Sequence, residues 1–75
     1  MPLVQVKVIE GVFSDDSKRQ IVEGLTEAMV AVEGENMRGV TWVIVEEVRS
    51  GQWGIGGNAL TTQDVKALAS GVPAG

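Results

Sequence analysis

The chain has 75 residues, enough for one small domain whose core would be marginal on its own. It contains no Cys and no His, which excludes disulfides, thiolate zinc sites and histidine general bases. Ten acidic and six basic residues give a net charge of −4, and the scattered cations argue against a nucleic-acid surface.

The chain carries no signal for a membrane or for export. No apolar run approaches the roughly 20 residues needed to cross a bilayer, and the N-terminus lacks the basic-then-apolar layout of a signal peptide. We therefore expect a cytoplasmic protein whose partners are small molecules or proteins, with no membrane or nucleic-acid partner. We expect a single domain over residues 1–75 with a loose tail at 68–75, and neither a cofactor nor a metal site.

Pro2 stands between the initiator Met1 and an alternating segment, residues 3–9. Cells trim Met from Met-Pro starts, and trimming would leave a rigid secondary amine at the tip of a strand. Such an amine is a candidate general base. The simpler interpretation is a residue suited to the first position of a strand, where a missing N–H costs nothing. Taken alone, Met-Pro favours the simpler interpretation.

The first two elements are a strand and a helix. Val4, Val6 and Val8 alternate with more polar positions, which predicts a strand over residues 3–9 that Glu10-Gly11 ends. Ser14 is a good N-cap, and a helix from about 15 to 33, closed by Gly34, should follow. Its apolar positions recur at helical spacing: Ile21, Val22, Leu25, Ala28, Met29 and Val32.

A second strand is predicted over residues 40–46, after a polar turn at 35–39. This segment is rich in β-branched residues and apolar on both faces, as a buried parallel strand would be. A strand, a crossover helix and a second strand form a right-handed β-α-β unit. Two strands leave a sheet edge and an apolar face without a partner, so we expect the chain to oligomerise.

Residues 54–59 fit the loose dinucleotide-binding pattern G-x-G-x-x-G/A. Too little chain follows to complete that fold, and the acidic residue expected about 20 positions further on is absent. We therefore predict a Gly-rich hairpin within residues 50–57, followed by a short helix from Thr61 to Ala69.

Acidic side chains gather where the strands end, at Glu10, Glu46 and Glu47. Adjacent strand residues point to opposite faces, so Glu46 and Glu47 cannot act together on one substrate. We interpret all three as solvated strand ends. Trp42 and Trp53 suit core or interface packing, and either could also wall a pocket.

Five features in this order carry a family resemblance: Pro2, the strand leading to Glu10-Gly11, the helix opened by Ser14-Asp15-Asp16-Ser17-Lys18, the strand ending Val43-Ile44-Val45-Glu46-Glu47, and Trp53-Gly54-Ile55-Gly56-Gly57. Over about residues 2–60 the chain resembles the 4-oxalocrotonate tautomerase family. The resemblance implies an α+β fold, a β-α-β subunit with a short C-terminal hairpin, and sheets joined across subunits. It also implies a homo-hexamer built as a trimer of dimers, or a hetero-oligomer in which a second subunit contributes to the site.

The resemblance further implies keto–enol tautomerisation with Pro2 as the catalytic base. The amine must then be neutral near pH 7, and its reference pKa is about 7.7 to 8.0. Apolar surroundings lower that pKa because they disfavour the ammonium. We expect Leu3, Ile9, Val12 and Trp53 to supply such surroundings.

Two positions depart from the family pattern. Where the founding tautomerases have arginines that grip a dicarboxylate, this chain has Val12 and Trp42. Because no other side chain restores the bidentate guanidinium fork, a small, mostly apolar enol or 2-oxo acid is the expected substrate. Val12, Trp42, Trp53, Leu3 and Ile9 are the expected substrate-binding residues. Lys7, Arg38 or Arg49 could hold a single carboxylate.

Two other functions stay open at this point. Relatives that act as dehalogenases, hydratases or decarboxylases use a protonated proline as an acid, together with a carboxylate and arginines. Alternatively, the chain is a non-catalytic oligomeric binding module that retains the fold. With Met1 attached, the Pro2 nitrogen is an amide without a basic lone pair, so removal of Met1 is the decisive event.

Overall fold

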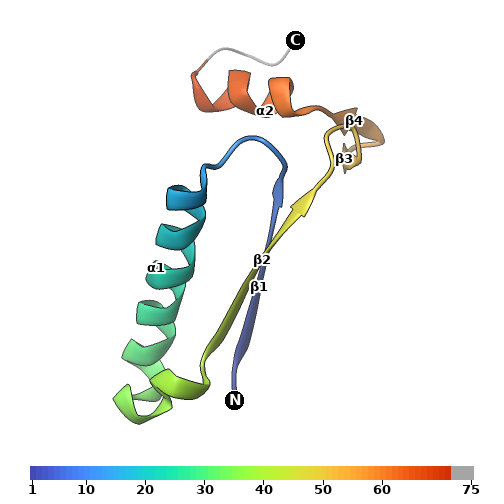
Figure 1. Ribbon diagram of the computed structural model, residues 1–75. Coiled ribbons are helices and arrows are strands. Elements are labelled where there is room, and N and C mark those ends of the chain that lie inside the picture. Colours follow the sequence, from blue (N-terminus) through green and yellow to red (C-terminus); the bar gives the residue numbers. More distant parts are fainter. Residues whose placement is uncertain (72–75) are drawn as a thin grey trace. The chain divides into compact units, whose positions relative to one another are not determined.

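The computed structural model describes residues 1–71, and the chain forms two compact units. The first unit comprises residues 1–6 and 14–46, and the second comprises residues 7–13 and the chain from 47 onward. The elements in chain order are β1 (Leu3–Ile9), α1 (Asp15–Glu33), the 3₁₀-helix η1 (Glu35–Val40), β2 (Trp42–Val48), β3 (Trp53–Ile55), β4 (Asn58–Leu60) and α2 (Thr62–Ala69) (Figure 1). This order confirms the predicted β-α-β subunit with a C-terminal hairpin.

β1 and β2 are hydrogen-bonded neighbours in a two-stranded sheet, and they run in the same direction (Figure 1). Near the start of both strands, the Trp42 N–H donates to the Pro2 C=O at 3.1 Å. Near their ends, the Glu10 N–H donates to the Val48 C=O at 2.8 Å. Parallel strands need a crossover connection, which α1 supplies as expected.

α1 begins and ends where the sequence predicts. The Ser14 hydroxyl oxygen accepts a hydrogen bond from the Ser17 N–H at 3.1 Å, and Asp15 and Asp16 lie at the positive end of the helix dipole. At the other end, Gly34 has a φ of +100° and donates its N–H to the Val30 C=O at 2.8 Å. These caps fix both the length of the helix and the point at which the chain turns toward β2.

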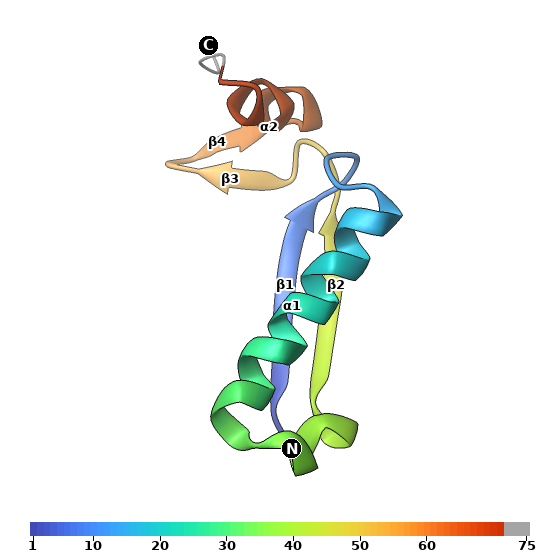
Figure 2. The same ribbon diagram turned by 90° about the vertical axis from the view of Figure 1, so that its left-hand side faces the viewer.

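The buried face of α1 differs in part from the predicted stripe. α1 lies along one face of the strands of the first unit (Figures 1 and 2), with Val30 buried and Val22 and Met29 half-buried. Val32 is 87% exposed and Ala28 is also exposed, so two of the six apolar positions at helical spacing do not join the buried face.

β2 begins and ends two residues later than the predicted segment 40–46. Val40 belongs to η1. Thr41 caps the end of this helix, and its N–H donates to the Arg38 C=O at 3.3 Å. Glu46 and Glu47, expected to close the strand, lie inside β2, which continues to Val48. Both side chains are exposed.

β3 and β4 form an antiparallel hairpin, as the glycine pattern predicts. Trp53 pairs with Leu60, and Ile55 pairs with Asn58. The two turn residues, Gly56 and Gly57, have φ angles of +58° and +84°, which side chains disfavour. Residues 54–59 are thus a hairpin tip and not a dinucleotide-binding loop.

α2 starts one residue after the predicted boundary because Thr61 is its cap. The Thr61 hydroxyl accepts from the Asp64 N–H at 3.2 Å, and the Asp64 carboxylate accepts from the Thr61 N–H at 2.9 Å. This reciprocal pair satisfies two of the otherwise unbonded groups at the helix start. α2 continues through residues 68 and 69, which the tail prediction had included; residues 72–75 of that tail lie outside the described part of the chain.

Little of the described chain is buried. Within residues 1–71 the buried hydrophobic side chains are Val8, Ile9 and Val30. On the strand face that α1 leaves open in the first unit, Leu3 is 51% exposed, Trp42 55% and Ile44 38%. The single chain therefore shows the unpartnered apolar face that the two-strand topology predicts.

Candidate active site

Pro2 lies immediately before β1 and is half-buried. Its carbonyl is fixed by the hydrogen bond from the Trp42 N–H, while Met1 on its other side is 79% exposed. Removal of Met1 would take away an exposed residue and would leave the hydrogen bond from the Trp42 N–H to the Pro2 C=O in place. The resulting ring amine would stand at the head of β1 with its backbone already held.

Leu3 and Trp42 are the expected site residues nearest to Pro2 along the chain and across the sheet. Their exposure alternates with that of the half-buried Val4 and Val43, which places both on the open face of the strands. The surroundings of Pro2 on this face are apolar, but they are open to water in a single chain.

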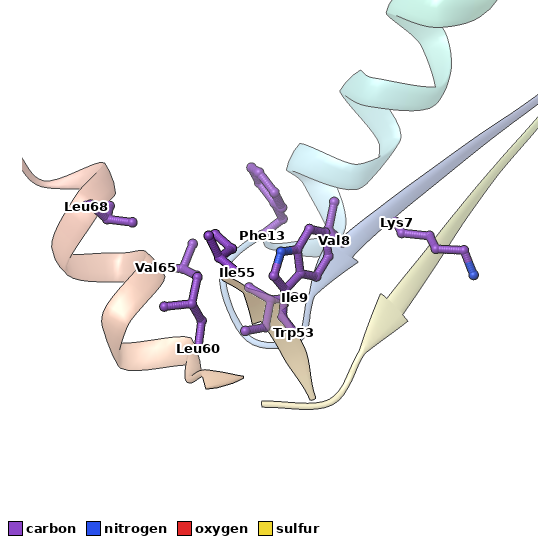
Figure 3. Close-up of a pocket in the computed structure, with 9 residues that line it drawn as sticks. All are labelled: Lys7, Val8, Ile9, Phe13, Trp53, Ile55, Leu60, Val65 and Leu68. Carbon is purple, nitrogen blue, oxygen red and sulfur yellow. The ribbon is translucent and has the colours of Figure 1, made fainter. Parts of the chain in front are cut away.

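Ile9 and Trp53 lie in the second unit, where they line an apolar pocket of about 290 Å³. We call this space the α2 pocket, because α2 forms one of its walls. Figure 3 shows apolar side chains gathered around it, while the Lys7 amine points away from them. The lining residues are Lys7, Val8, Ile9, Phe13, Trp53, Ile55, Leu60, Val65 and Leu68.

Val12 is half-buried in the connection between β1 and α1, and it is not among the residues that line the α2 pocket. The expected site residues thus fall into two groups: Pro2, Leu3 and Trp42 in the first unit, and Ile9, Val12 and Trp53 in the second. Pro2 precedes β1 and Ile9 ends it, and seven extended residues span roughly 23 Å.

Arg38, a candidate for holding a substrate carboxylate, is occupied by two glutamates. Its Nη1 and Nη2 donate to the Glu27 carboxylate at 2.5 and 3.1 Å, and its Nε and Nη2 donate to the Glu35 carboxylate at 2.6 and 3.1 Å. The hydrogen bonds from Arg38 lower the pKa of Glu27 and of Glu35, and the same bonds raise the pKa of Arg38. Arg38 therefore ties η1 to α1 instead of presenting its guanidinium to a ligand.

Glu10 is exposed, as expected of a strand end, but it has a structural role that the sequence did not reveal. Its carboxylate accepts from the Ser50 N–H at 2.9 Å, and its C=O accepts from the Thr62 hydroxyl at 2.6 Å. The Thr62 N–H in turn donates to the Ser50 hydroxyl oxygen at 2.8 Å. These three residues form a closed cycle, which we call the Glu10–Ser50–Thr62 ring. It joins the ends of β1 and β2 to the start of α2.

The sequence offered only part of the signal for this ring. A threonine pair ahead of a helix indicates a cap, but it does not indicate that Thr62 bonds to Glu10, 52 positions away.

A metal site and a membrane-spanning helix were both sought among the described residues. No cluster of three acidic side chains within residues 1–71 could hold a metal ion, and no helix in that range is long and apolar enough to span a bilayer.

Comparison with known proteins gives the family. A family model described as "Tautomerase enzyme" matches residues 2–63. The chain belongs to the tautomerase family. It is 33% identical over 67 residues to a probable tautomerase K2 of Dickeya dadantii, covering 89% of this chain and 98% of the relative. It is 34% identical over 64 residues to the 2-hydroxymuconate tautomerase of Bacillus subtilis, covering 85% of this chain and all of the relative.

Structural similarity agrees with the sequence match. A 4-oxalocrotonate tautomerase isozyme from Methylibium petroleiphilum superposes with a TM-score of 0.68 at 34% identity, covering 77% of this chain and 90% of that one. The matched range of this tautomerase chain includes Pro2, both long strands, α1 and the hairpin, and it ends at residue 63. Family membership supports a tautomerase-type activity and the isomerase class. Most of α2 lies beyond the match.

Proposed function

We propose that the chain is a keto–enol tautomerase whose general base is the Pro2 amine, set free when Met1 is removed. The nitrogen takes the proton from the hydroxyl of an enol, and a proton is returned at carbon as the C=O forms. The observation that carries the proposal is the placement of Pro2, half-buried at the head of β1 with its carbonyl held by Trp42. Membership of the tautomerase family supports the same chemistry.

The base must be neutral at working pH, and its surroundings favour that form once they are covered. An α-amino group has a reference pKa of about 7.7 to 8.0, and desolvation lowers this value. Leu3 and Trp42 offer no charge beside Pro2, and Trp42 is large enough to exclude much of the water. Covering this face by a second copy would therefore bury the half-buried Pro2 further and favour the neutral form of its amine.

We include a homo-oligomer in the proposal. Antiparallel pairing of β1 with β1 of a second copy would place Pro2 of each copy near the Ile9 end of the other, because β1 is extended throughout. Such pairing would also merge two two-stranded sheets into one of four strands and reduce the exposed edges. A hexamer built as a trimer of dimers extends this arrangement. The alternative is a hetero-oligomer, in which a second type of subunit could supply the arginines that Val12 and Trp42 replace. A cytoplasmic location remains part of the proposal.

The proposed substrate is a small, mostly apolar enol or 2-oxo acid. Val12 and Trp42 replace cationic side chains with apolar ones, and Arg38 already binds two carboxylates. A dicarboxylate would need at least two charges satisfied, and desolvating an unpaired carboxylate is costly. An aryl or alkyl enol with at most one carboxylate fits this composition better.

Mass spectrometry and kinetics on the same samples test the proposal. Intact mass shows whether Met1 is present, and ketonisation of phenylenolpyruvate is followed by its ultraviolet absorbance. Protein without Met1 should be active, protein that retains Met1 should be inactive, and Pro2→Ala should lose roughly a hundredfold or more in kcat/KM. Gln20→Ala, at an exposed position on α1, serves as the matched control with unchanged rates.

Sedimentation of the same samples separates loss of chemistry from loss of assembly. If forms with and without Met1 ketonise the substrate equally fast, Pro2 is not the base. If both are inactive yet assembled, the non-catalytic binding module is the better description of the chain.

A further inference from the structure

Thr41 connects η1 to β2 and is anchored through both its backbone and its side chain. Its N–H donates to the Arg38 C=O at 3.3 Å, and its hydroxyl donates to the Met37 C=O at 2.8 Å. The same hydroxyl also contacts the carboxylate of Glu33, the last residue of α1. Thr41 is therefore tied to the end of α1 and to η1 at the point where the chain enters β2.

This anchoring fixes the direction of the Trp42 N–H. That N–H lies in the peptide plane shared by Thr41 and Trp42, so the backbone angles of Thr41 set where it points. Thr41 has a φ of −90° and a ψ of 118°, and its β-branched side chain is stiff about χ1. The Trp42 N–H meets the Pro2 C=O at 3.1 Å. A change at Thr41 therefore reaches Pro2 through one peptide unit and one hydrogen bond.

The position of the Pro2 ring depends on this hydrogen bond. Proline has no N–H to contribute to strand pairing, so the Pro2 C=O is the group through which its own backbone joins β2. Pro2, Thr41 and Trp42 all belong to the first unit. A general base must be aimed at the proton it removes, and a displacement of about 1 Å can cost roughly a hundredfold in rate. Loosening the Trp42 bond would let the nitrogen leave that alignment.

We propose that Thr41 is a positioning residue for the reaction, which holds the Trp42 N–H on the Pro2 C=O and so aims the Pro2 amine. The inference rests on the proposed function, in which this amine is the base. Thr41 acts through Trp42 and needs no contact with the substrate. Its loss should therefore appear in kcat and leave KM nearly unchanged.

Thr26 provides a matched comparison for Thr41. Both threonines are half-buried, and both donate a hydroxyl to the C=O four positions earlier, which for Thr26 is that of Val22 at 2.7 Å. Thr26→Val removes such a bond inside α1, away from the path to Pro2. In protein without Met1, Thr41→Val should lower kcat for phenylenolpyruvate roughly tenfold and change KM less than about twofold. Thr26→Val should leave both constants unchanged, and Thr41→Ser should restore most of kcat.

Amide hydrogen exchange tests the same link without any measurement of activity. The reference for Trp42 is Ile44, two residues further along β2, whose N–H points the same way because strand residues alternate. Thr41→Val should speed the exchange of Trp42 roughly threefold or more relative to Ile44. Thr26→Val should leave this ratio unchanged. Circular dichroism checks that both variants keep α1.

Glu33→Ala is a second route to the same result if Thr41→Val does not fold. It removes one contact of the Thr41 hydroxyl and leaves the Met37 C=O as acceptor, so kcat and the Trp42 exchange ratio should change in the same directions but less. Glu23→Ala, at an exposed position of α1, is its control and should change neither value.

Two results would overturn the positioning role of Thr41. One is a Trp42 exchange ratio that Thr41→Val does not change. The other is an equal loss of kcat in Thr41→Val and Thr26→Val, which would show that these hydroxyls contribute only to stability. A normal kcat in Thr41→Val beside an inactive Pro2→Ala refutes the positioning role alone, whereas a fully active Pro2→Ala refutes the base.

Discussion

Gly11 occupies a position whose backbone conformation and surroundings both disfavour a side chain. Its φ is +80°, and a Cβ built there would lie 3.0 Å from the Thr62 Cγ2 atom. Gly24 is a useful contrast, because it lies inside α1 with nothing within 4 Å of a built Cβ. Gly11 is required by the turn and by the close approach of Thr62, whereas Gly24 only lowers the stability of α1.

Alanine at these two positions should have opposite effects on the free energy of unfolding. Gly11→Ala should lower it by about 1 to 2 kcal/mol, because a left-handed conformation and a tight contact both oppose a side chain. Gly24→Ala should raise it by about 0.5 to 1 kcal/mol through helix propensity. Urea titrations followed by circular dichroism measure both values. A Gly11→Ala chain as stable as the natural one would contradict the role of the turn.

The cluster around Arg38 should make stability depend on pH. Because Arg38 lowers the pKa of Glu27 and Glu35 in the folded chain, its contribution is fully present above the ordinary value of 4.5 and is lost as the pH falls through the lowered values. Arg38→Gln should lower the urea midpoint at pH 7, and the difference should shrink below about pH 4. The effect should be modest, since exposed ion pairs contribute little.

Arg19→Gln is the control for this measurement. Arg19 contacts one carboxylate, that of Asp16, at 3.0 Å, so its removal should change the midpoint less. A difference between Arg38→Gln and the natural chain that is the same at pH 3.5 and pH 7 would show that the carboxylates do not contribute through their charge.

At the scale of elements, α2 depends on the Glu10–Ser50–Thr62 ring. Thr62→Val keeps the shape of the side chain and removes the hydroxyl that donates to the Glu10 C=O. We expect a loss of about 0.5 to 1.5 kcal/mol in the free energy of unfolding. Thr62→Ser, which keeps the hydroxyl, should recover most of it. If the serine variant is as unstable as the valine variant, packing of the methyl group matters more than the hydrogen bond.

Elements with strong local signals could be predicted from the sequence, and those set by tertiary contacts could not. The cap at Ser14 and the glycine pair at 56–57 located α1 and the hairpin because each demands a particular backbone conformation. β2 was displaced by two residues, because Val40 has strand propensity but is held in η1 by local hydrogen bonds. β-Branched composition does not separate a strand from the turn that precedes it.

The same distinction applies to the candidate site. Pro2 and Trp53 could be put forward as candidates from position and spacing, since each belongs to a recognisable local pattern. The Glu10–Ser50–Thr62 ring and the α2 pocket could not, because their members are far apart in sequence and their pairing depends on how the second unit folds. Helical spacing of apolar residues did not show which of them are buried, and Val32 is 87% exposed although it shares that spacing.

At the scale of the whole molecule, the proposed oligomer would cover the exposed apolar face of the first unit. Trp42→Glu puts a charge in the open face of the first unit, so it should dissociate an assembly that covers this face while the monomer tolerates it. Sedimentation velocity at several concentrations should show the natural chain as an oligomer and the variant shifted toward monomer. Gln20→Glu adds the same charge at an exposed position on α1 and should leave the distribution unchanged. A natural chain that sediments as a monomer throughout would remove the assembly from the proposed function.

The Glu10–Ser50–Thr62 ring closes a long loop, and this has a consequence for folding. The Gly51 N–H donates to the Leu60 C=O across the hairpin, so the long loop is closed by the bond between Glu10 and Ser50, which are 40 positions apart. The remaining bonds then form between groups that are already neighbours and cost little more. The ring should therefore open and close cooperatively, and the start of α2 should be released when it opens.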